Sequence, residues 1–256
     1  MRRAAVAIVK LTSCSGCINE FLYTIASYPE LLRSVSIVHA TEFQDLNTLE
    51  DIDVALVEGS VVTQHQEELV KEVRSRARTL IAIGTCATFG GIQAGRVGED
   101  LRKVILASYP NPDFISALPD VKSLDRVVKV DFNLSGCPVN GDALARLLVK
   151  VILGGSEVPI AESVCSECKR VGVLCVMVSR GVPCLGPVTL GGCGAICPRF
   201  GRGCYGCYGL NTTVVDGERL ARFSEVLEKV GMGRGDLEAF LKYFSFSALT
   251  KIRVRE

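Results

Sequence analysis

Residues 4–27 read AAVAIVKLTSCSGCINEFLYTIAS and show how the chain begins. Residues 4–9 form a continuous apolar run, which is typical of a strand that is covered on both faces of a sheet. From Ile18 to Ala26 the apolar side chains recur at helical spacing, and Pro29 follows soon after. The stretch therefore predicts a strand, a short loop with Cys14 and Cys17, and a helix.

The same alternation continues through the first 153 residues. Continuous apolar runs predict further strands at Val35–His39, 54–57, 80–83 and 127–132. Helical spacing predicts amphipathic helices over 69–77 and 143–152. Strands that alternate with helices are typical of an α/β fold, so we expect a doubly wound parallel sheet.

Gly154, Gly155 and Ser156 interrupt this pattern, and Pro159 follows them. We expect a domain boundary here, with one domain at 1–154 and a second at 155–256. Residues 165–207 have no clear periodicity but hold eight cysteines, so this segment needs internal cross-links to become ordered. Amphipathic patterns predict C-terminal helices around 220–230 and 237–244.

The composition limits the kinds of protein that this chain could be. Of its 256 residues, 48% are hydrophobic and 22% are charged, and the net charge is +1. Such a balance favours a folded protein without a nucleic-acid partner. No apolar run reaches the roughly 18–20 residues that a membrane span needs. Arg2 and Arg3 could belong to a twin-arginine signal, but a first strand explains the N-terminus better, and we expect a cytoplasmic protein.

Cysteine is unusually frequent, with twelve residues against two histidines. Disulfide frameworks are typical of short secreted chains, so metal or cluster ligation is the better explanation. Four of the cysteines follow predicted strands: Cys14 and Cys17, Cys86, and Cys137. The carboxyl ends of parallel strands line one crevice, so these thiols should meet there, and soft thiolates suit iron–sulfur clusters. Buried structural cysteines, a zinc site and a flavin site are the alternatives.

The last eight cysteines divide in chain order into two sets of four. They are Cys165, Cys168, Cys175 and Cys184, followed by Cys193, Cys197, Cys204 and Cys207. Residues 160–210 carry five Lys and Arg against two Glu, and this excess of three positive charges would suit anionic clusters. Two zinc ribbons are an alternative. An exchange of Cys197 between the sets is also open, because Cys193-x₃-Cys197-Pro198 resembles the end of a ferredoxin motif.

Several motifs together resemble the small subunit of NiFe hydrogenases, over most of the chain to about residue 210. They are LTSCSGC at 11–17, VEG at 57–59, GTCATFGG at 84–91, GCP at 136–138, PCLGPVT at 183–189, GC at 192–193 and CYGC at 204–207. The last three look like the cytoplasmic group, which includes sulfhydrogenase, NAD(P)-linked, viologen-reducing and deazaflavin-reducing enzymes. The resemblance implies a flavodoxin-like first domain, which is also found in a subunit of respiratory complex I.

The resemblance also implies three 4Fe–4S clusters. Cys14, Cys17, Cys86 and Cys137 would hold the proximal cluster; Cys165, Cys168, Cys175 and Cys184 the distal cluster; and Cys193, Cys197, Cys204 and Cys207 the medial cluster. Periplasmic relatives have His at the position of Cys165 and Pro at the position of Cys197. Ser15 matches a position implicated in proton transfer, and Glu20 and Glu58 would also lie near the proximal cluster. Local hydrogen bonding, or for Glu20 an interaction with the helix dipole, would explain these three residues without such a role.

The function that the resemblance implies is electron transfer within a hydrogenase. A separate large subunit would carry the nickel–iron site, and this chain would pass electrons to a further subunit or carrier. NAD(P) with flavin, deazaflavin, ferredoxin and a disulfide reductase are all open as acceptors. A complex I-like subunit and a zinc-binding interaction protein are the alternatives, and the eight additional cysteines argue against the former.

Overall fold

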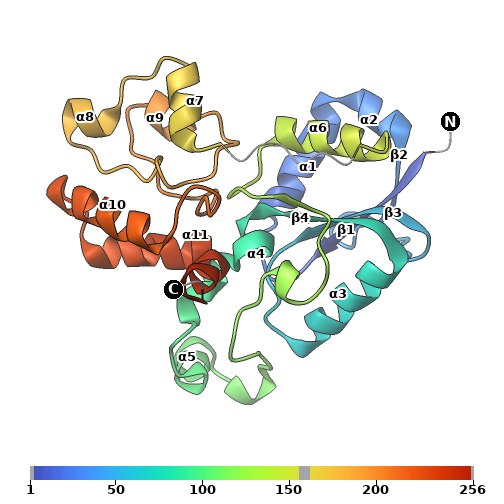
Figure 1. The fold of residues 1–256 in the computed structure, drawn as a ribbon. Helices are drawn as coiled ribbons and strands as arrows, with labels where there is room; N and C mark the ends of the chain where they lie inside the picture. Colours follow the sequence, from blue (N-terminus) through green and yellow to red (C-terminus); the bar gives the residue numbers. More distant parts are fainter. Residues whose placement is uncertain (1–2, 156–161, 255–256) are drawn as a thin grey trace.

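The computed structural model describes residues 3–155 and 162–254, and a parallel sheet lies at the centre of the N-terminal part (Figure 1). The strands are β1 (Ala4–Lys10), β2 (Val35–His39), β3 (Ile52–Glu58), β4 (Ala77–Ile83) and β5 (Phe132–Leu134). Their order is β2-β1-β3-β4-β5, and every neighbouring pair is parallel. This is the flavodoxin-like order, so the predicted α/β fold is confirmed.

Helices cover both faces of the sheet (Figure 1). Alternate residues of β1 point to opposite faces: Val6 and Ile8 belong to one apolar core, and Ala7 and Val9 belong to the other. The first core also contains residues of α1 (Gly16–Ser27) and α6 (Gly141–Ile152), whereas the second contains residues of α3 (Gln64–Arg76). Burial on both faces explains why the strands are continuously apolar in the sequence.

The strand predicted at 127–132 is largely wrong, because pairing starts only at Phe132. Val127, Val128 and Val130 are apolar because they pack against the core on the α3 face, not because they belong to a strand. Asp131 then joins the chain to β4, since its N–H donates to the carbonyl of Leu80 at 3.0 Å and its carboxylate accepts the N–H of Leu80 at 2.8 Å.

Several predicted helix limits also shift. Ala77, which was assigned to a helix, is the first residue of β4, and α1 starts at Gly16. The sequence did not predict the helices that follow α1 and β4. These are α2 (Pro29–Ser34), α4 (Gly84–Phe89), η1 (Gly91–Arg96), α5 (Leu101–Ser108), η2 (Pro112–Phe114) and η3 (Leu124–Arg126).

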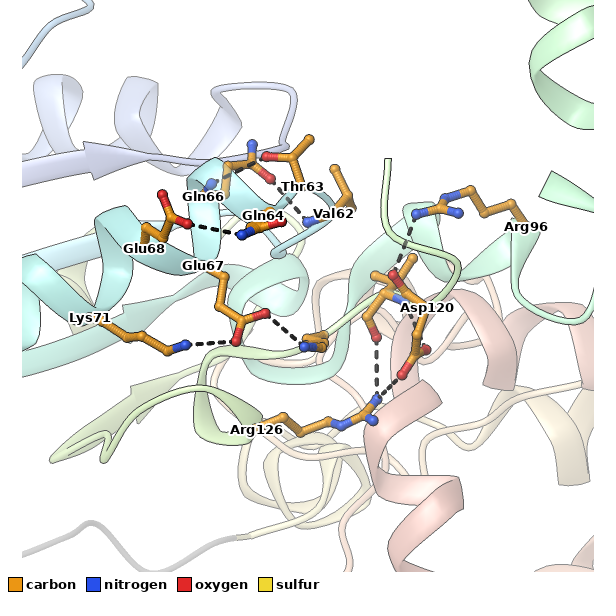
Figure 2. Close-up of polar contacts among 12 residues, drawn as sticks. Val62, Thr63, Gln64, Gln66, Glu67, Glu68, Lys71, Arg96, Asp120 and Arg126 are labelled. Carbon is orange, nitrogen blue, oxygen red and sulfur yellow. Dashed lines mark hydrogen bonds and ion pairs between the residues drawn. The ribbon is translucent and has the colours of Figure 1, made fainter. Parts of the chain in front are cut away.

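Polar contacts fasten the segment that leads to β5 onto the start of α3 (Figure 2). The two carboxylate oxygens of Glu67 accept hydrogen bonds from Lys71 at 2.8 Å and from Lys122 at 2.7 Å. Nearby, Arg126 pairs with Asp120 at 2.7 Å. These contacts hold the segment that contains η3 in place before the chain delivers Cys137 to the edge of the sheet.

The C-terminal part contains more regular structure than its sequence predicted. Three short helices lie among its cysteines: α7 (Val164–Arg170), α8 (Val176–Arg180) and α9 (Ile196–Arg199). Two longer helices follow, α10 (Gly217–Lys229) and α11 (Arg234–Val254), and α11 is kinked at Ser245. They share an apolar core with Leu185 and Val188, so the end of the chain supports the cysteine-rich segment.

The two parts of the chain contact each other. α11 packs on α4 and η1, and the hydroxyl of Ser247 donates to the carbonyl of Thr88 at 3.2 Å. The domain boundary expected after residue 154 falls partly outside the described residues and stays a prediction. Among the residues that the structure describes, no helix is both long and apolar enough to cross a bilayer.

Candidate cluster-binding sites

The first set of cysteines lies at the carboxyl edge of the sheet. Cys14 and Cys17 follow β1, Cys86 lies in α4 directly after β4, and Cys137 follows β5. The four thiols are close enough to interact electrostatically: Cys86 interacts with Cys14, Cys17 and Cys137, and Cys137 also interacts with Cys14. Cys17 is buried, whereas Cys14 and Cys137 are exposed. The set therefore opens onto the surface.

Two glycines leave room for the sulfur atoms of this set. Gly84 has a φ of +86°, and a Cβ added there would lie 2.5 Å from the Sγ atom of Cys17. Gly91 has a φ of +67°, and a Cβ added there would clash with the Sγ atom of Cys86. Both positions thus require glycine for the backbone and for the space beside a thiol.

The thiols of this set are poorly suited to remain as bare anions. Burial, followed by the charges of Cys137 and Cys14, raises the pKa of Cys86 to about 11. Burial also raises the pKa of Cys17 and that of Cys137. Positively charged iron would compensate four neighbouring thiolates, so this donor set fits an iron–sulfur cluster.

Glu58 supports the loop of this set from the end of β3. Its two carboxylate oxygens accept the N–H groups of Ile18 at 2.8 Å and of Cys17 at 3.4 Å. Burial raises the pKa of this carboxyl group, and the hydrogen bond from Ile18 opposes the shift. Glu58 therefore satisfies free N–H groups in the first turn of α1, which is a structural role.

Ser15 and Glu20 occupy different surroundings. Ser15 has a φ of +64° and immediately precedes α1, between Cys14 and Cys17. Glu20 lies beyond the first turn of α1, which contains no acidic residue, so the helix-dipole explanation for Glu20 is wrong. A Cβ added at Gly141 would lie 3.2 Å from a carboxylate oxygen of Glu20, so this side chain lies against the start of α6.

The second set lies around α7 and α8. Cys165 and Cys168 belong to α7, Cys175 immediately precedes α8, and Cys184 follows it. The thiol of Cys165 interacts with the other three, and burial is the main cause that raises its pKa to about 11. A Cβ added at Gly186 would lie 3.4 Å from the Sγ atom of Cys184 and 3.5 Å from that of Cys165. Both thiols therefore lie beside Gly186. Cys175 is exposed.

The third set consists of Cys193, Cys197, Cys204 and Cys207, and none of these cysteines is exposed. Burial, and then the charges of Cys193, Cys137 and Cys197, raise the pKa of Cys207 to about 12. The third set therefore interacts with the first set through Cys137. It also contacts the second set, because the N–H of Cys204 donates to the Sγ atom of Cys184 at 3.2 Å.

Two residues that sequence reasoning missed, Thr85 and Tyr208, connect these sets. The hydroxyl of Thr85 donates to the carbonyl of Cys207 at 2.5 Å and accepts the N–H of Gly136 at 3.1 Å. The ring of Tyr208 is buried, and it lies between Gly136 beside the first set and Gly192 beside the third. Their only signal is adjacency to cysteines, since Thr85 precedes Cys86 and Tyr208 follows Cys207.

In residues 3–155 and 162–254, no three His, Cys, Asp or Glu side chains are close enough to hold one metal ion.

Comparison with known proteins shows the family. Residues 14–151, more than half of the chain, match the family described as NADH ubiquinone oxidoreductase, 20 kDa subunit. The chain is also 37% identical over 204 residues to sulfhydrogenase 2 subunit delta of Pyrococcus furiosus, covering 80% of this chain and 85% of that protein. This chain belongs to the hydrogenase small subunits of that family. The family match includes all four cysteines of the first set.

Two further relatives agree with this assignment. The F420-non-reducing hydrogenase of Methanocaldococcus jannaschii has a subunit that is 31% identical, over 82% of this chain and 83% of that protein. Among solved structures, a chain of an NAD⁺-reducing [NiFe]-hydrogenase in the H₂-reduced state is 25% identical, with a TM-score of 0.57. That match covers 62% of this chain and 97% of the solved chain.

Proposed function

We propose that this chain is the electron-transfer subunit of a NiFe hydrogenase and holds three 4Fe–4S clusters. The observation that supports the proposal is that all twelve cysteines are free and that neighbouring thiols interact electrostatically within each assigned set, with family membership as independent support. The proposed ligands are the cysteines at 14, 17, 86 and 137, at 165, 168, 175 and 184, and at 193, 197, 204 and 207. Bound clusters would supply the redox-active iron.

The exposure of the thiols supports an order for the relay. The first set reaches the surface at Cys14 and Cys137, and the second reaches it at Cys175. The third set has no exposed cysteine and interacts with both others, through Cys137 and through Cys184. We infer that electrons enter and leave at the first and second sets and pass through the third between them.

We infer two partners from the two exposed ends. A large subunit with the nickel–iron site would cover the first set, where H₂ and protons interconvert, and an acceptor would approach the second set near Cys175. The acceptor would be a flavin subunit that uses NAD(P), a deazaflavin, a ferredoxin or a disulfide reductase. Ser15, beside the first set, is a candidate for proton transfer towards the large subunit; Glu20 is a weaker one, because it lies against α6. We also infer a cytoplasmic location, because the motifs at 183–189, 192–193 and 204–207 resemble those of the cytoplasmic group.

The experiment is to purify the native complex, identify its subunits and count the clusters by electron paramagnetic resonance. We expect a nickel-containing partner, three 4Fe–4S clusters on this chain, and hydrogen-dependent reduction of a dye only when the partner is present. Hydrogen evolution by this chain without any nickel subunit would refute the proposal. A colourless chain with bound zinc would refute it as well.

A further inference from the structure

Glu167 connects the second set of cysteines with the third. It lies on α7 between Cys165 and Cys168, and one of its carboxylate oxygens accepts the N–H of Gly192 at 2.8 Å. The other oxygen accepts the N–H of Ala195 at 3.2 Å and lies 3.7 Å from the Sγ atom of Cys193. A single side chain therefore joins the helix of one set to the loop of the other.

The loop around Cys193 depends on contacts of this kind. Ala195 has a φ of +54° although it is not glycine, and this conformation persists only where the surroundings enforce it. Ala195 is fully buried, so the surrounding protein must satisfy its N–H group. The N–H of Gly191 donates to the carbonyl of Glu162 at 2.7 Å, so the segment before α7 also holds this loop.

The charge of Glu167 also lies at the junction between the sets. The thiol of Cys168 interacts electrostatically with that of Cys193, so the two sets approach each other at this point. A carboxylate beside Cys193 adds negative charge where an electron would arrive. Because added negative charge disfavours reduction, it lowers the potential of the nearest cluster.

We propose that Glu167 is a positioning residue for electron transfer between the second and third clusters. It holds the Cys193 loop against α7, which sets the distance between the two clusters, and its charge lowers the reduction potential of the third. The step moves one electron between clusters and neither forms nor breaks a bond. This inference depends on the proposed function.

The test compares Glu167→Gln and Glu167→Ala in the purified complex with the unmodified protein. Gln keeps the shape of Glu but has no charge, and it can accept only one of the two N–H groups well. Glu162→Gln is the control, because Glu162 is exposed, pairs with Arg170 and does not accept from the loop through its side chain. Iron content is measured by chemical iron analysis, and the midpoint potentials and the magnetic coupling between reduced clusters are measured by paramagnetic resonance during a redox titration.

We expect Glu167→Gln to retain its iron and to raise the midpoint potential of one cluster, with Glu162→Gln unchanged. Glu167→Ala should also alter the magnetic coupling, because the loop loses both hydrogen bonds. Potentials, coupling and iron content that stay unchanged in both variants would overturn the inference. If the unmodified chain itself shows no 4Fe–4S signals, the proposed function fails instead.

Discussion

At the scale of single residues, one sulfur atom lost or one carbon atom added should decide whether a cluster binds. Cys197 belongs to α9 and is the second of the four cysteines assigned to the third set. Gly84 is not a ligand, but it leaves space for the sulfur of Cys17 in the first set. Substitutions at these two positions test the ligand sets separately.

Replacing Cys197 with Pro should convert one of the three clusters to a 3Fe–4S form. The first turn of a helix tolerates Pro, but Pro supplies no ligand for the fourth iron. The potential of that cluster should rise, and electron transfer to a low-potential acceptor should slow. Paramagnetic resonance of the oxidised variant should show the new signal. Ile196→Ala, at the exposed preceding residue, is the control. Three unchanged 4Fe–4S clusters would mean that Cys197 is not a ligand.

Replacing Gly84 with Ala should remove the first cluster and leave the other two. The new Cβ would lie 2.5 Å from the Sγ atom of Cys17, on a backbone with a φ of +86°. Bound iron should fall by about a third, since one cluster of three is lost. Gly98→Ala is a matched control, because Gly98 has a φ of +91° but no atom within 4 Å of the added carbon. Equal iron losses in both variants would show that backbone strain alone is responsible.

At the scale of elements, a few polar contacts hold the segment between η2 and β5 against α3. The contacts of Glu67 fasten the segment before β5 to α3 (Figure 2). The hydrogen bond from Lys122, and then that from Lys71, lowers the pKa of Glu67 to about 2. Because this folded-state pKa lies below the ordinary value of 4.5, the carboxylate stabilises the folded protein above pH 4.5 and loses this effect as the pH falls towards 2.

Glu67→Gln should therefore make the stability of the iron-free chain less sensitive to acid. Between about pH 5.5 and about pH 3, the free energy of unfolding should fall less in the variant than in the unmodified chain. Urea denaturation followed by circular dichroism measures this difference, and iron-free protein avoids the loss of clusters in acid. Glu68→Gln is the control, because Glu68 accepts a hydrogen bond from neutral Gln64. Parallel losses in Glu67→Gln and the unmodified chain would contradict the assigned role.

At the scale of the whole molecule, the two parts differ in what holds them together. The sheet has two apolar cores on its two faces. The cysteine-rich segment has one small apolar cluster, and Cys184 and Cys204, two of the proposed ligands, belong to it. The segment therefore has little apolar burial of its own with which to offset its chain entropy.

Limited proteolysis of iron-free chain should cut within residues 165–207 and leave the sheet domain intact. The segment should resist cleavage once its thiolates bind iron, because ligation cross-links positions that are distant in the sequence. Gel electrophoresis and mass spectrometry of the fragments provide the measurement, with the iron-loaded protein as the control. Equal resistance of both regions without iron would contradict this prediction.

The sequence by itself determined the features that depend on neighbouring residues. Apolar runs predicted four strands well, helical spacing predicted α1, α3 and α6, and the motifs identified the family. Sequence reasoning misplaced β5, because Val127, Val128 and Val130 are as apolar as strand residues although they pack on the core outside the sheet.

The resemblance already implied that the third set is the medial one. Only the tertiary structure showed that Cys207 lies near Cys137, and that Thr85, Tyr208 and Glu167 connect the sets. The physical reason is that periodicity and residue type are local properties of the chain. The distance between thiols on remote segments depends instead on how the sheet, the short helices around the cysteines and α11 pack together.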